Sequence, residues 1–555
     1  MNNNRRSDTS ILVQGSVLAI ASIVSRIIGM VYRIPMTNII GEYGNDYYSC
    51  AYEIYSLVLL ISSYSLPMAV SKLVSIRMAR RERQNTNRVY LGAMLIAIIT
   101  GTAGCIFIFF GAGFLTRVFQ TPLSFLALRV LAPTLIIVAI LGVLRGFFQG
   151  LGTMVPSAIS QILEQIVNAV VSVAAAFVLF GYGTRIAAVL GGDQHYAEAY
   201  GAAGGTLGTG VGAAVGLICI AIMFVLYRRN FKKDIRREQS LHQTEEEPFG
   251  SVIKVLLMTI FPILLSTTLY NLVSIVDQGL FKNLAIAQGN LADTVSLWWG
   301  VYSGYYRVLI NVPIAISTAI ASSIVPAVSA AFARKDPDQV RHRINLALRF
   351  IMIIAIPCAV GLAVLARPII DLLYNTTQDV LAARLLQAGA ITVLFYSIST
   401  LSNAVLQSID RMRIPIRNAV ISLAANIASV PICLYVFHLN IYTMIVGNIV
   451  FSLVMCILNG LSVHKYSGFK VNIKRTYVLP AVAAVLMGVI VYVVYFLINR
   501  FSGSNALATI IGIVVGVIVY AVFLLLVRGI TEEELQSFPR GAGIARVAKK
   551  LHLLR

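Results

Sequence analysis

Residues 505–527, NALATIIGIVVGVIVYAVFLLLV, contain no charged side chain. This stretch is long enough to cross a bilayer as one helix, which takes about 20 mostly apolar residues. Similar apolar runs recur from Ile11 to Phe523, separated by polar breaks. The whole chain of 555 residues is 58% hydrophobic and only 12% charged, whereas a soluble domain is about 25% charged. These patterns exclude a soluble enzyme and predict a polytopic membrane protein.

Hydropathy, together with breaks at charge clusters, glycine and proline, predicts an all-α fold of fourteen transmembrane helices. An N-terminal lobe (1–227) holds six spans, near 11–32, 50–76, 90–116, 122–144, 155–181 and 201–227. A cytoplasmic basic linker (228–250) leads to a C-terminal lobe (251–465), with spans near 251–281, 295–332, 344–365, 380–406, 416–437 and 441–463. Spans 13 and 14, near 476–498 and 505–527, occupy residues 466–528, and a cytoplasmic amphipathic tail covers 529–555.

The 44 Lys and Arg against 23 Asp and Glu give a net charge of +21. Cytoplasmic loops of membrane proteins carry an excess of Lys and Arg. If the N-terminus is cytoplasmic, nearly every basic cluster falls on an inside loop. The segments placed outside then carry only Arg33, Arg117, Arg185, Lys282, Arg367 and Arg500. We therefore expect both termini in the cytoplasm of a multi-pass plasma-membrane protein, and no nucleic-acid partner.

Two short motifs occur twice. The run Leu66–Ser71 resembles Val325–Ser329, and their prolines, Pro67 and Pro326, are 259 positions apart. The junctions Gln149–Pro156 and Gln407–Pro415 repeat at almost the same offset. Because each repeat would hold an even number of spans, the pattern predicts two lobes related by a pseudo-two-fold axis along the membrane normal, with substrate bound between them.

Catalytic and metal-binding patterns are absent from the sequence. There is no HExxH or GxSxG motif, and the six cysteines are scattered singly without a CxxC pair. The glycines at 204, 208, 212 and 216 lie in an apolar span at four-residue spacing, which favours close helix packing over a phosphate loop. We expect no enzyme activity and no cofactor.

Ionisable residues inside spans are the candidates for function, because each is costly at the bilayer centre. Arg26 and Arg33 are seven residues apart and share one face of span 1, about 10 Å apart along it. Arg307 lies in span 8. Arginine suits bidentate contact with phosphate, so we predict that the three bind an anionic substrate. The alternatives are that they snorkel to an interface or pair with Glu53 or Asp277.

Acidic residues inside spans are fewer. Asp277 in span 7 and Glu53 in span 2 are candidates for ion coupling or charge balance, and Glu164 in span 5 for holding its neighbours by hydrogen bonds. Asp277 is the stronger candidate for a coupling cation, Na⁺ or H⁺, because hydroxyl and amide oxygens lie near it along the span. These belong to Ser266, Thr267, Thr268, Asn271 and Ser274.

Three motifs carry a resemblance to a known family. They are Ser25–Gly29 followed by Arg33, Leu66–Lys72 at the end of span 2, and Tyr306–Arg307 through Pro313 in span 8. They resemble the polysaccharide-flippase branch of the multidrug/oligosaccharidyl-lipid/polysaccharide exporter superfamily, and within it the lipid II flippases of the MurJ type in their Gram-positive form, similar to sporulation protein B.

The resemblance implies a V-shaped pair of lobes around a cationic central cavity, with spans 13 and 14 forming a groove for a lipid tail. Matching motifs give Arg26, Arg33 and Arg307 the cavity-arginine roles. The family's sodium site maps in part, as Asp277 with Asn418 or Asn426, and span 11 lacks the family's acid.

We therefore expect a monomeric flippase that moves an undecaprenyl-diphosphate-linked peptidoglycan precursor, lipid II, from the inner to the outer leaflet by alternating access. Its partners are the lipid-linked oligosaccharide and the bilayer. Alternatives are a flippase for another lipid-linked glycan (capsule, teichoic or spore coat) and a multidrug cation antiporter. A membrane-embedded transferase is a further class, for which His195 and His438 are the residues to test.

Overall fold

The computed structural model describes residues 17–18, 20–190, 193–240, 246–527 and 529–530. The beginning of span 1 and the expected amphipathic tail after residue 530 lie outside the described residues. Within the described ranges the chain is all-helical, with no strand. Contacts divide it into two compact units, Met1–Gly300 and Val301–Arg555.

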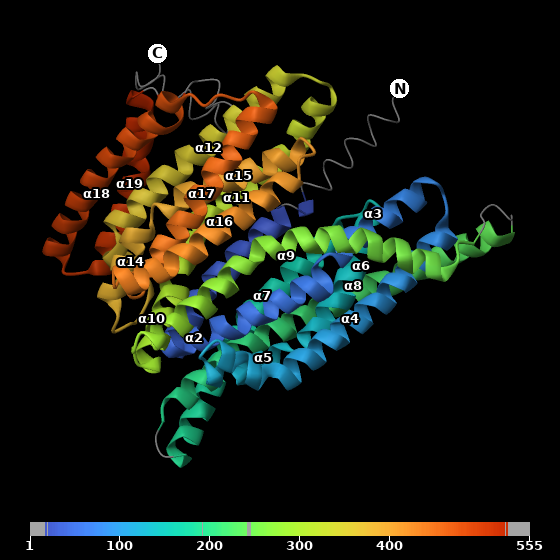
Figure 1. Cartoon of the computed structure of the whole chain (residues 1–555), viewed down its shortest axis with the longest axis horizontal. Helices are drawn as coiled ribbons and strands as arrows, with labels where there is room; N and C mark the ends of the chain where they lie inside the picture. Colours follow the sequence, from blue (N-terminus) through green and yellow to red (C-terminus); the bar gives the residue numbers. More distant parts are fainter. Residues whose placement is uncertain (1–16, 19, 191–192, 241–245, 528, 531–555) are drawn as a thin grey trace. The chain divides into compact units, whose positions relative to one another are not determined.

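The helices of the first unit begin with Ile20–Val31 and continue with α2 (Arg33–Leu59), α3 (Leu66–Ala79), α4 (Arg83–Val118), α5 (Phe125–Leu131), α6 (Thr134–Gly150), α7 (Val155–Val189), α8 (His195–Ser240), α9 (Phe249–Ala287) and α10 (Ala292–Val301) (Figure 1). Those of the second unit are α11 (Arg307–Ala333), α12 (Pro337–Val364), α13 (Ala366–Leu373), α14 (Asp379–Gly389), α15 (Thr392–Ser408), α16 (Arg413–Pro431), α17 (Tyr442–Ser467), α18 (Leu479–Ser502) and α19 (Asn505–Leu526). Short π-helical segments are η1 (Leu60–Tyr64), η3 (Tyr302–Tyr306), η4 (Ile432–Val436) and η5 (Lys474–Val478), and η2 (Pro122–Ser124) is a 3₁₀ turn.

Eleven of the described helices are long and apolar enough to cross a membrane. The count becomes twelve if α14 and α15, which meet at 46°, form one bent span. Two shorter apolar helices, Ile20–Val31 and Phe249–Phe261, fall where spans 1 and 7 are expected. An all-helical, polytopic membrane protein is confirmed, and the count of fourteen spans stays a prediction.

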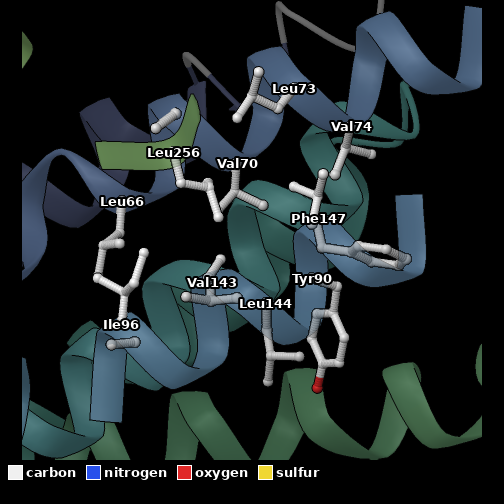
Figure 2. Close-up of a cluster of buried hydrophobic side chains, with 14 of the residues drawn as sticks. Leu66, Val70, Leu73, Val74, Tyr90, Ile96, Val143, Leu144, Phe147 and Leu256 are labelled. Atoms are coloured by element: carbon white, nitrogen blue, oxygen red, sulfur yellow. The ribbon is translucent and has the colours of Figure 1, made fainter. Parts of the chain in front are cut away.

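A hydrophobic core holds α3, α4, α6, α8 and α9 together in the first unit. Figure 2 shows side chains of α3, α4 and α6 meeting Leu256 of α9. Leu66 and Val70, from the first copy of the repeated motif, belong to this core. A Cβ on Gly146 of α6 would come within 2.9 Å of the Pro67 Cα. Glycine at 146 thus lets α6 approach the proline of α3 closely, which gives the motif a packing role.

The basic linker expected at 228–250 is mostly helix. Instead of ending at Tyr227, α8 runs on to Ser240, because the Lys, Arg, Glu and Gln of this stretch are good helix formers. Near the end of the linker, Glu247 is bound by Arg77 of α3 at 2.5 Å, and its backbone N–H donates to the side-chain oxygen of Asn85 of α4 at 3.1 Å. The start of α9 is therefore tied to α3 and α4.

The four-residue glycine stripe packs α8 against α7, as its spacing predicts. A Cβ on Gly212 would lie 2.6 Å from the carbonyl oxygen of Glu164, and one on Gly216 would lie 3.2 Å from that of Ser160. Both carbonyls belong to α7, and backbone cannot move aside as a flexible side chain can. The glycines are therefore needed for the closeness of the two helices.

Gly212→Ala is expected to destabilise the protein by about 1–3 kcal/mol, the usual cost of overpacking a filled interior. The measurement is the thermal unfolding temperature of the purified protein in detergent. Gly113→Ala in α4 is the matched control, because a Cβ there meets nothing within 4 Å. Equal unfolding temperatures for the two variants would contradict the packing role.

The second unit contains a counterpart to one turn of the first. Gly152, between α6 and α7, and Asp410, between α15 and α16, both have left-handed backbone, with φ of 83° and 59°. These positions are 258 apart, which is the offset of the repeated sequence junctions. Lobe symmetry across the whole chain stays a prediction. At the end of this unit α18 packs on α19 (Figure 1), and Arg349 of α12 donates to the Gly529 carbonyl at 2.9 Å.

Candidate functional site

A sharp bend in α2 places Arg33 against residues far along the same helix. Gly41 has φ of 68° and ψ of −171°, a conformation open mainly to glycine. In a straight helix Arg33 and Tyr48 would be about 22 Å apart, yet the Arg33 guanidinium lies 4.7 Å from the centre of the Tyr48 ring. The chain therefore folds back at Gly41, where the hydropathy pattern predicts a longer loop between spans 1 and 2.

The bend divides this part of the chain into two legs, one before and one after Gly41. The two arginines expected in span 1, Arg26 and Arg33, lie on the leg before the bend. Arg33 is half-buried, and its guanidinium stacks on an aromatic ring instead of meeting a carboxylate. Its Nε is buried without a hydrogen-bond partner among the described residues. Arg26 is exposed, and no described acidic side chain forms an ion pair with it. Neither positive charge is therefore neutralised by an acid within the described part of the chain.

The leg that carries Arg26 contacts α7 through polar side chains. Ser22 donates to the Gln161 side chain at 3.4 Å, and Asn168 donates to the Tyr32 hydroxyl at 3.4 Å. A hydrophobic helix contact would need none of these groups. The pair of helices therefore has a polar seam that runs beside the arginines.

Glu164 of α7 holds its neighbours, as its place in span 5 predicts. Its carboxylate accepts a hydrogen bond from Arg145 of α6 at 2.7 Å, and Arg145 also donates to Ser160 at 2.9 Å. Arg145 directly follows the expected end of span 4, so charge counting alone assigns it to a cytoplasmic loop. Its side chain is instead only 18% exposed, and its role is to neutralise Glu164.

A second buried ion pair, between Lys282 and Asp46, is not predicted by hydropathy or by charge counting. Lys282 of α9 contacts both carboxylate oxygens of Asp46 of α2, at 2.5 and 2.6 Å. It also donates to Thr121 at 2.6 Å, and Ser296 of α10 donates to Asp46 at 2.5 Å. Lys282 and Asp46 are 1% and 0% exposed. The hydropathy pattern ends span 7 at residue 281 and assigns Lys282 to an outside loop, whereas α9 continues to Ala287 and the lysine side chain is buried.

The expected cation site around Asp277 lies partly outside what is described. Asp277 is buried on α9, and Ser274 is half-buried one turn before it. The side chains of Ser266, Thr267, Thr268 and Asn271 are not among those described. Asn426 is buried in α16 of the second unit, and Asn418 donates to Asn459 at 2.8 Å. Within the described ranges no three His, Cys, Asp or Glu side chains gather as metal ligands. A coupling site at Asp277 stays a prediction.

Arg307 opens α11 in the second unit and is half-buried. It directly follows the π-helical turn η3, a backbone feature often found at functional sites. Glu53, the other candidate acid, is half-buried on α2 in the first unit. Arg26, Arg33, Glu53 and Asp277 thus belong to the first unit, and Arg307 and Asn426 belong to the second. Convergence of all three arginines stays a prediction.

These features define the class of protein: an α-helical, polytopic membrane protein in which Arg26 and Arg33, in the first expected span, form no ion pair with an acid among the described residues. The family described as polysaccharide biosynthesis protein matches residues 11–332, and the family MatE matches residues 262–433. The chain therefore belongs to the polysaccharide biosynthesis protein family.

Curated relatives and solved structures agree with this assignment. The chain is 23% identical to the lipid II flippase MurJ of Bacillus subtilis, over 89% of this chain and 90% of that protein. It is 26% identical to the stage V sporulation protein B of the same organism, over 73% and 74% of the two chains. The chain is thus a homologue of MurJ.

Two solved structures share the fold. A lipid II flippase MurJ in an inward closed conformation matches with a TM-score of 0.61 at 17% identity, over 91% of this chain and 97% of that one. An inward-facing multidrug resistance MATE family transporter of the MOP superfamily matches with a TM-score of 0.64 at 15% identity, over 80% and 98%. Because the same fold serves both proteins, the choice of cargo rests on the site.

Proposed function

We propose that this protein is a flippase for a lipid-linked oligosaccharide in the plasma membrane, and that its cargo is the peptidoglycan precursor lipid II. Similarity to a lipid II flippase over 89% of the chain supports the proposal. MurJ is a lipid II flippase and the MATE protein is a transporter, and no covalent step is required to move a lipid between leaflets.

One observation favours an anionic cargo over a cationic drug: the balance of charge inside the first unit. The carboxylates of Asp46 and Glu164 are occupied by Lys282 and Arg145. Arg33 stacks on Tyr48, and Arg26 is exposed. A site for cations needs available carboxylates, whereas a diphosphate needs available guanidinium groups. Of these four groups, the two acids are neutralised and the two arginines have no acidic partner among the described residues, which favours an anionic cargo over the cationic drug of a multidrug antiporter.

In the proposed cycle the diphosphate binds to Arg26, Arg33 and Arg307, which replace its hydration shell while the polyprenyl tail stays in lipid. Spans 13 and 14, here α18 and α19, are the proposed tail groove. Rocking of two lobes then exposes the site to the other side. A membrane potential that is negative inside favours outward movement of the anion by about 2.3 kcal/mol per charge per 100 mV. We further propose cytoplasmic termini, a monomeric flippase, no cofactor, and Asp277 as the candidate for a coupling Na⁺ or H⁺.

Rescue of depleted bacteria tests the cargo. One strain lacks its lipid II flippase, and a second lacks a flippase for a teichoic or capsule precursor. We expect the wild-type chain to restore growth of the first strain and not the surface glycan of the second. The opposite result, at equal membrane expression, would assign the protein to another lipid-linked glycan.

A further inference from the structure

The side chain of Tyr52 stands out in the first unit because it extends the Arg33 stack and remains open. Its ring is parallel to that of Tyr48, with an angle of 8° between the planes and 5.8 Å between the centres. The guanidinium of Arg33 covers Tyr48 at 4.7 Å. Arg33, Tyr48 and Tyr52 thus form one continuous stack that begins with a cation and ends with an aromatic ring.

Burial distinguishes the members of this stack. Tyr48 is 1% exposed and Tyr55, one turn beyond Tyr52, is 2% exposed, whereas Tyr52 itself is 38% exposed. The Tyr52 ring also makes a tilted contact with the Tyr55 ring, with 6.0 Å between the centres. An open ring that is fixed by two buried neighbours loses little conformational entropy when a ligand packs on it.

The depth of Tyr52 follows from the bend at Gly41. Arg33 and Arg26 precede the bend by eight and fifteen residues, and Tyr52 follows it by eleven. Because the two legs run back along each other, residues at equal distances from the bend lie at the same level. Tyr52 is therefore level with the stretch between Arg33 and Arg26. A diphosphate that bridges the arginines would therefore bring its first sugar next to this ring, since a glycosyl diphosphate joins the sugar to phosphorus through a single oxygen.

The surroundings indicate an aqueous face. A lipid-facing surface would make the charges of Arg26 and Arg33 costly, and neither arginine has an acidic partner among the described residues. Pyranose rings carry a face of C–H groups that packs on the negative face of an aromatic ring, while the phenol hydroxyl can donate to a sugar oxygen. Tyr52 offers both groups to a saccharide.

We propose that Tyr52 is a sugar-binding residue that stacks on the pyranose attached to the diphosphate of the cargo. This inference rests on the proposed function, because it places the sugar by means of the diphosphate bound to Arg26 and Arg33. It makes Tyr52 a specificity residue, which distinguishes glycosylated carrier lipid from the bare carrier.

Equilibrium binding of two labelled lipids to the purified full-length protein tests the assignment. The probes are lipid II and undecaprenyl diphosphate, which has the same tail and diphosphate but no sugar. We expect Tyr52→Leu to weaken binding of lipid II about ten-fold, within the range known for aromatic contacts, and to leave undecaprenyl diphosphate unchanged. Tyr52→Trp keeps the aromatic face and is expected to retain the preference for lipid II.

Tyr182→Leu is the matched control. Tyr182 is 53% exposed on α7 of the same unit and packs edge-on against Tyr200, away from the Arg33 stack. If the wild type binds both lipids but Tyr52→Leu weakens both equally or neither, the assignment of Tyr52 is overturned and the proposed function stands. If the wild type binds neither lipid, the proposed function fails and the assignment fails with it.

Discussion

Arg33→Ala is expected to abolish rescue of a bacterium depleted of its own lipid II flippase. The substitution removes a guanidinium that stacks on Tyr48 and forms no ion pair with any acid that the structure describes. A charged hydrogen bond in a desolvated site contributes about 1.5–3 kcal/mol, so we expect affinity for undecaprenyl diphosphate to fall about 10- to 100-fold. Arg307→Ala, a substitution in the second unit, is expected to cause the same loss of rescue.

Two further variants separate a binding role from a structural one. Arg33→Lys keeps the charge but loses the planar group that stacks and bonds in a bidentate manner, so partial rescue is expected. Arg129→Ala in α5 is the matched control, because this arginine also lies over aromatic rings, at 5.3 Å from Phe125 and 5.6 Å from Phe109, but makes no contact with the stack. Full rescue by Arg33→Ala at wild-type membrane levels would show that Arg33 does not bind the cargo.

Removal of one partner of the Lys282–Asp46 pair is expected to have the largest effect on stability. Lys282→Met leaves a fully buried carboxylate that keeps a hydrogen bond from Ser296. Breaking a buried ion pair by removing one member costs about 3–5 kcal/mol. Asp46→Leu leaves an ammonium group in the same environment and is expected to be equally harmful. The measurement is the unfolding temperature and the yield of folded protein in detergent.

The double variant Asp46→Leu with Lys282→Met provides the decisive comparison. Because no charge is left buried, it is expected to be more stable than either single variant, as replacement of buried pairs by apolar groups often is. A strongly non-additive double-mutant cycle would confirm that the two side chains act as one unit. Additive losses would show that each contributes through separate contacts.

Several local features of the fold could be predicted from the sequence. Charge-free runs such as residues 505–527 become helices of nearly the same extent, because each backbone group in lipid must find its partner within the helix. The four-residue glycine spacing in α8 predicts close packing on α7, and the contacts of Gly212 and Gly216 with α7 bear this out. Such features depend on residues near one another in the chain.

The ends of helices were harder to predict than their apolar middles where they were placed at charged or polar residues. The basic residues after Tyr227 suggest a linker, but α8 continues through them to Ser240. The loop expected before residue 50 is instead a tight bend at Gly41. In both places hydropathy marks where the apolar stretch ends, whereas backbone hydrogen bonds decide where the helix ends.

The sequence by itself determined the class of this protein, its apolar helices and the candidate arginines, because hydropathy and the cost of a buried charge can be assessed at each position. Only the tertiary structure decided which charges are neutralised. Lys282 meets Asp46 across 236 positions, and Arg145 of α6 neutralises Glu164 of α7. Partner choice depends on how α2, α6, α7 and α9 pack, and the chain's return at Gly41 is what brings Arg33 to Tyr48. Neither follows from local composition, since the partners are distant in sequence and adjacent only after folding.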